Sequence, residues 1–76
     1  MKNNSFVLPK HWHSSDKGRI SCKEKIKVLN ENIQEFQTMA NDILDEAILM
    51  GADKEQFLET MKQVVLSTNS SLKNAK

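Results

Sequence analysis

Two histidines and one cysteine are the residues of this chain best suited to bind a metal ion. His11 and His13 flank Trp12, Asp16 follows, and Cys22 is the only cysteine. Imidazole nitrogens and a thiolate are ligands for zinc or copper. A His-x-His pair in an irregular segment with a single cysteine does not match the usual ligand spacings. We therefore expect these side chains to stay solvated around the tryptophan, and we predict neither a metal nor a cofactor.

Cys22 and a group of acidic residues are the other candidates for chemistry. Cys22 lies at the start of a predicted helix, where the helix dipole lowers a thiol pKa, but no general base lies nearby in a structured element. The acidic group lacks the Glu-x-x-His pattern of carboxylate metal sites in helical bundles and lies outside the apolar seam. It comprises Glu31, Glu35, Asp42, Asp45 and Glu46. We predict no catalytic residue and no enzymatic activity.

Basic residues concentrate before and at the start of the first predicted helix. Residues 1–25 carry a net charge of +4, whereas residues 26–50 carry −4. Such a region could contact phosphates, which gives an alternative function as a small nucleic-acid-binding regulator. Its candidate contacts are Lys10, Lys17, Arg19, Lys23 and Lys27. Their spacing spreads them over several faces, so nucleic acid remains the alternative partner.

Helix-start and helix-stop signals define the elements that would hold these residues. Residues 21–24 read Ser-Cys-Lys-Glu, a capping-box pattern, and residues 53–56 read Asp-Lys-Glu-Gln. Gly51 can adopt the left-handed conformation that ends a helix. The sequence therefore predicts helices over about 22–50 and 54–73, joined by a turn so short that they must run antiparallel. The fold class is all-α, a two-helix hairpin.

An apolar seam with steps of three and four residues runs along each predicted helix. In the first it comprises Ile26, Leu29, Ile33, Phe36, Ala40, Ile43, Ala47 and Met50. In the second it comprises Leu58, Met61, Val65, Thr68 and Leu72, widened by Phe57 and Val64. We expect a truncation of Phe36 or Phe57 to alanine to cost about 3–5 kcal/mol if these residues form a true core.

Residues 1–20 are predicted to form an irregular arm ahead of the hairpin of residues 21–76. The arm contains Phe6, Val7, Leu8 and Trp12, more apolar bulk than a disordered tail usually carries. Pro9 keeps Leu8 extended, so Leu8 and Trp12 can serve as anchors. We expect the arm to dock, either on its own helices or on a partner.

The two helices are too unequal in length for one to cover the other. The second helix reaches back only to about Asn30, so Ile26, Val28 and Leu29 overhang, and Met39, Leu44 and Ile48 widen the apolar stripe. A third layer is needed: the arm, a second copy, or another protein. The predicted function is a non-enzymatic protein–protein interaction module that can also self-associate. Its candidate partner contacts are Leu8, Trp12, Ile26, Leu29, Leu44 and Ile48.

Size and composition agree with a single small domain outside the membrane. The chain has 76 residues and a mean hydropathy of −0.56. No apolar run approaches the roughly 20 residues that cross a bilayer, and no secretory signal is evident. One cysteine excludes an intrachain disulfide. The expected location is the cytoplasm.

Overall fold

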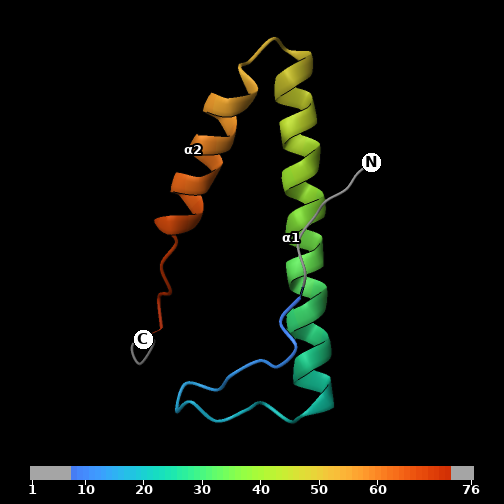
Figure 1. Ribbon diagram of the computed structural model, residues 1–76, viewed down its shortest axis with the longest axis vertical. Helices are drawn as coiled ribbons and strands as arrows, with labels where there is room; N and C mark the ends of the chain where they lie inside the picture. The colour runs from blue at the N-terminus through green and yellow to red at the C-terminus, as the bar shows by residue number, and fades with distance from the viewer. Residues whose placement is uncertain (1–7, 73–76) are drawn as a thin grey trace. The chain divides into compact units, whose positions relative to one another are not determined.

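The computed structural model describes residues 8–72 and contains two helices (Figure 1). Helix α1 spans Lys23–Leu49 and helix α2 spans Lys54–Leu66, and residues 8–72 contain no strand of a sheet. The predicted all-α hairpin is confirmed, and the described part of the predicted arm, residues 8–20, is irregular. The chain divides into two compact units, Met1–Gln34 and Glu35–Lys76, so α1 passes through both. The hairpin contact between α1 and α2 belongs to the second unit.

Helix α1 begins one residue later than the capping-box pattern predicted. The backbone N–H of Ile26 donates to the carbonyl of Cys22 at 3.0 Å, which makes Cys22 the N-cap residue. The prediction that Ser21 caps this helix is therefore wrong. Serine and cysteine both carry a short side chain that accepts from backbone N–H groups, so either Ser21 or Cys22 could have served as the N-cap residue.

The turn between the helices is built as predicted around Gly51. Its φ angle of 95° is left-handed, which costs glycine little because it has no Cβ. The N–H of Gly51 donates to the carbonyl of Ile48 at 3.0 Å, and the N–H of Ala52 donates to the carbonyl of Ala47 at 2.9 Å. These two bonds form a Schellman motif, which satisfies carbonyls that a helix end leaves free.

Helix α2 begins as the sequence predicted and ends earlier. The carboxylate of Asp53 accepts from the backbone N–H of Gln56 at 2.8 Å, which confirms the predicted cap. The helix stops at Leu66, before the predicted end near residue 73, which itself lies outside the described residues. The hydroxyls of Ser67 and Thr68 both donate to the carbonyl of Val64 at 2.9 Å. Such local bonds compete with helix continuation.

The described part of the arm is an irregular segment with one tight turn. The backbones of His13 and Arg19 form an isolated antiparallel bridge, and the N–H of Lys17 donates to the carbonyl of Ser14 at 2.9 Å. The carboxylate of Asp16 accepts from the Ser14 hydroxyl and from the N–H of Gly18. The predicted docking residues Phe6 and Val7 lie outside the described residues.

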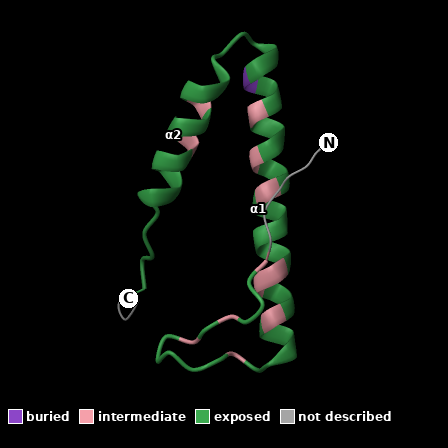
Figure 2. Cartoon of the chain, in the orientation of Figure 1, coloured by how far each residue is buried: buried purple, intermediate pink, exposed green. Residues whose placement is uncertain are grey.

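Very little of the second unit is buried, as Figure 2 shows. Ala47 is the only residue among 8–72 classed as buried, with 3% of its surface exposed. Ala47 lies next to the turn, where its carbonyl also accepts from Ala52. Neither helix is long and apolar enough to cross a membrane, as far as residues 8–72 are concerned.

Candidate partner-binding groove

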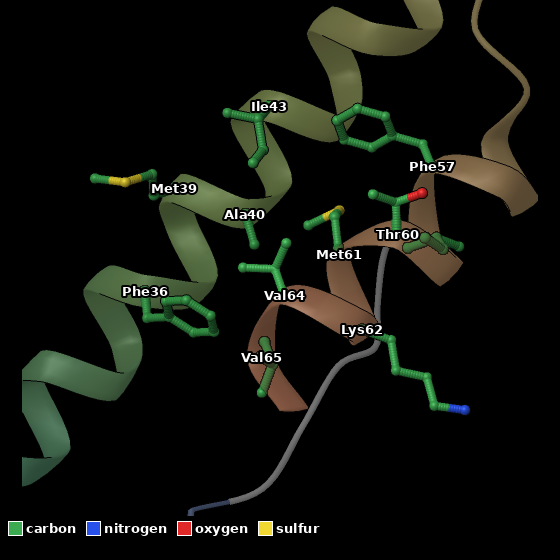
Figure 3. Close-up of a pocket in the computed structure, with 11 residues that line it drawn as sticks. Phe36, Met39, Ala40, Ile43, Phe57, Thr60, Met61, Lys62, Val64 and Val65 are labelled. Atoms are coloured by element: carbon green, nitrogen blue, oxygen red, sulfur yellow. The ribbon is translucent and has the colours of Figure 1, made fainter. Parts of the chain in front are cut away.

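An open apolar groove runs between the second half of α1 and helix α2 (Figure 3). It has a volume of about 490 Å³ and lies entirely within residues 35–72. Its lining is hydrocarbon and thioether apart from one threonine and one lysine. The lining residues are Phe36, Met39, Ala40, Ile43, Phe57, Leu58, Thr60, Met61, Lys62, Val64 and Val65.

Helical periodicity places these side chains on facing surfaces of the two helices. On α1, Phe36, Ala40 and Ile43 are separated by four and three residues, so they share one face. On α2, Phe57, Met61 and Val64 follow the same spacing. Figure 3 shows both sets directed into the space between the helices. At 1.5 Å per residue, each row is roughly 10 Å long, or about two helical turns.

The groove is open because the helix pair does not cover its own apolar surface. Phe36 remains 56% exposed, Met39 66% and Val64 61%. Only Phe57, Met61 and Ala40 are half-buried within it. Exposed apolar patches bordered by polar residues are typical of interaction sites.

The sequence predicted most of the residues that line this groove, but it placed them in the packed seam between the two helices. The seam and the residues that widen it included Phe36, Ile43, Phe57, Met61 and Val65, all of which line the groove. Thr60 and Lys62 were not predicted, because neither residue type signals an apolar surface. The helical spacing of Thr60 from Gln56 and Val64 was the available signal.

Four of the predicted partner contacts are instead packed within residues 8–34. Trp12 donates its indole Nε1–H to the Oδ1 atom of Asn30 at 2.7 Å, and it lines a small pocket together with Ile26. Leu8, Trp12, Ile26 and Leu29 are each half-buried. The arm therefore does cover part of the first half of α1. Val28 remains 51% exposed.

The remaining predicted contacts do not line the groove. Leu44 is half-buried and Ile48 is 44% exposed, and both are on α1. Neither is among the groove residues. A role of Leu44 and Ile48 in partner binding stays a prediction.

The basic residues predicted for the nucleic-acid alternative are all exposed. Lys10 and Arg19 border the Trp12 pocket, and Lys23 and Lys27 are one turn apart on α1. The ammonium of Lys27 lies 3.7 Å from the carboxylate of Glu31, which offsets part of its charge. Lys17 lies in the arm's turn with a positive φ of 74°. Phosphate binding here stays a prediction.

The candidate metal ligands are not brought together. Among residues 8–72, no three His, Cys, Asp or Glu side chains lie close enough to hold one ion. Asp16 is occupied by its own turn, and its bonds from the Ser14 hydroxyl and then the Gly18 N–H lower the pKa of this carboxyl. The N–H groups of Lys25 and then Glu24 lower the pKa of the exposed Cys22 thiol. These hydrogen bonds make the Asp16 carboxylate part of the arm's turn and the Cys22 thiol part of the N-terminal cap of α1.

Comparison with known proteins adds no family or fold relative, because no family model, curated protein or solved structure matches this chain.

Proposed function

We propose that this protein is a non-enzymatic interaction module that binds another protein through the groove of residues 35–72. The observation that carries the proposal is that this unit has more apolar side-chain surface than its two helices bury against each other. Large apolar side chains line a groove of about 490 Å³, while Ala47 is the only buried residue among residues 35–72. Removing such side chains from water contributes about 25 cal/mol per Å² of apolar surface, which favours an occupant.

The chemical character of the groove supports binding rather than catalysis. Apart from Thr60 and from Lys62, whose ammonium points away from α1, methyl, thioether and phenyl groups line it, and these groups neither transfer protons nor attack a substrate. They do suit the non-directional packing of a partner's apolar side chains. Met39 and Met61 add flexible side chains that adapt to different partner shapes.

We also propose that the protein is located in the cytoplasm. Its single cysteine carries a free and exposed thiol, which is the form that a reducing compartment maintains.

Affinity capture from the native cell tests the interaction role. The bait variants are wild type, Phe36→Lys/Val64→Lys in the groove, and Leu49→Lys/Leu66→Lys as a matched control. Leu49 and Leu66 are 87% and 68% exposed and do not line the groove. Circular dichroism establishes that all three baits have the same helix content.

We expect one partner to be retained by wild type and by the control and to be lost with the groove variant. A charged side chain directed into an apolar interface costs far more than one left in water. If the groove variant captures the same proteins as wild type, the groove is not the binding surface and the proposed function is wrong.

A further inference from the structure

One edge of the groove is acidic. Met39 forms the groove's edge on α1, and Glu35, Asp42 and Glu46 lie four, three and seven residues from it. Residues at these spacings share one face of a helix. All three carboxylates are exposed, and the one ion pair found among residues 8–72 joins Lys27 and Glu31 instead. Within residues 8–72, these three carboxylates therefore have no cationic partner that would compete with an occupant.

The opposite edge, on α2, is polar but uncharged. Thr60 lines the groove there, Gln56 precedes it by one turn, and Gln63 follows within one turn. Lys62 is the only cation among the lining residues. Figure 3 shows its ammonium directed away from α1. Apart from Lys62, whose ammonium points away from α1, the charge beside this groove lies on the α1 side and is negative.

The unit that holds the groove is acidic as a whole. Residues 35–76 contain seven acidic and four basic residues, a net charge of −3. If a second copy of the chain bound this groove through the same unit, two negatively charged surfaces would face each other and repel. A cationic occupant would instead meet complementary charge, which chiefly determines partner choice and the rate of association.

We infer that the occupant is an α-helix of another protein, apolar on one face and bearing lysine or arginine along one flank. This inference rests on the proposed interaction role and specifies its partner. Each apolar row of the groove is about two turns long, the length over which a docked helix presents anchors at i, i+3 or i+4, and i+7. The basic flank lies beside Glu35 and Glu46, and the flank over Thr60 is neutral.

Two synthetic helical peptides of about 18 residues test this inference with the full chain. They share one leucine-rich face, and one flank carries either lysine or glutamate. Fluorescence anisotropy of a dye on the peptide gives the Kd at low and high salt, about 0.05 and 0.5 M. We expect the lysine peptide to bind on the order of tenfold more tightly at low salt. High salt should shrink this preference because it screens exposed charges.

Charge-reversal variants assign the preference to the acidic edge. Glu35→Lys/Glu46→Lys should reverse the order of the two peptides. Asp45→Lys/Glu59→Lys changes the net charge equally and is the control, because Asp45 lies six residues from Met39 and so off its helix face, Glu59 lies on α2, and neither residue lines the groove. This control should keep the preference for lysine.

Four results would overturn the inference, three from the peptide measurements and one from the oligomeric state. Equal affinity for the two peptides, no binding of the lysine peptide, or equal effects of the two charge-reversal pairs would each show that the edge does not select a basic helix. A dimer in sedimentation equilibrium that Phe36→Lys/Val64→Lys abolishes would assign the groove to a second copy. The interaction role would survive any of these results if that groove variant still loses its captured partner.

Discussion

The largest apolar side chain of residues 8–34 is held by its own neighbours, whereas those of residues 35–72 line an open groove. Trp12 is half-buried and hydrogen-bonded to Asn30. Phe36 and Val64 are more than half exposed. The arm therefore supplies the cover that the first half of α1 needs, while no third element among residues 8–72 covers the groove of the hairpin. The difference shows that a similar helical seam becomes a packed site or an exposed groove according to what the rest of the chain lays over it.

The largest expected effect comes from removing the cover of the first unit. Trp12→Ala should lower the free energy of unfolding by about 2–3 kcal/mol, somewhat less than for a fully buried tryptophan. Trp12→Phe keeps an aromatic ring but loses the bond to Asn30, so it should cost about 1 kcal/mol. Urea unfolding followed by circular dichroism measures both changes. An unchanged stability in Trp12→Ala would mean that the arm does not cover the helix in solution.

The next effect concerns the turn of the second unit. Gly51→Ala should cost about 1 kcal/mol because alanine is strained at positive φ. No atom lies within 4 Å of the added Cβ, so the cost comes from the backbone alone. Gly51→Asn should lose less, since asparagine tolerates the left-handed region. Thermal unfolding of the three proteins gives the order; equal stability of the alanine variant and wild type would contradict the left-handed turn.

A smaller effect distinguishes the open groove from a core. Phe36→Ala should lower stability by less than about 1 kcal/mol, because Phe36 is 56% exposed. Phe57→Ala should cost more, since that ring is half-buried against α1. Urea titrations of the isolated chain measure both. A loss of about 3–5 kcal/mol for Phe36→Ala would indicate a closed core and remove the contrast between the two units.

The smallest effect is a pH dependence within the arm. The folded pKa of Asp16 is lowered, first by the Ser14 hydroxyl and then by the Gly18 N–H. The turn's stabilisation is therefore present above the unfolded pKa of this carboxyl and is lost as pH falls through the folded one. NMR titration should show the amide signal of Gly18 moving at the low folded pKa. Asp16→Asn should abolish this shift, and a shift that persists would assign it to another group.

Local sequence signals predicted the ends of elements well where one residue type dominates. Gly51 and Asp53 have few competitors for their positions, and both adopt the expected geometry. Ser21 and Cys22 compete as caps, and the serine-rich stretch after Leu66 competes with the helix through side-chain bonds. Element ends of this kind depend on small energy differences that the pattern of residue types does not contain.

Periodicity predicted the face of each helix but not how far it is covered. Ala47 and Phe36 both belong to the apolar seam of α1, yet Ala47 is buried and Phe36 is mainly exposed. The distinction depends on distance from the turn and on the early end of α2, neither of which follows from the seam. The sequence therefore predicted which residues line the groove, but it did not predict that the groove is open.

The Schellman turn at Gly51 also bears on how quickly the hairpin forms. Its bonds join residues only three and five positions apart, and the groove rows on either side are close along the chain. Chains dominated by such short-range contacts have low contact order and fold in microseconds to milliseconds. The short-range bonds of this turn therefore favour rapid formation of the hairpin and, with it, of the two apolar rows that line the groove.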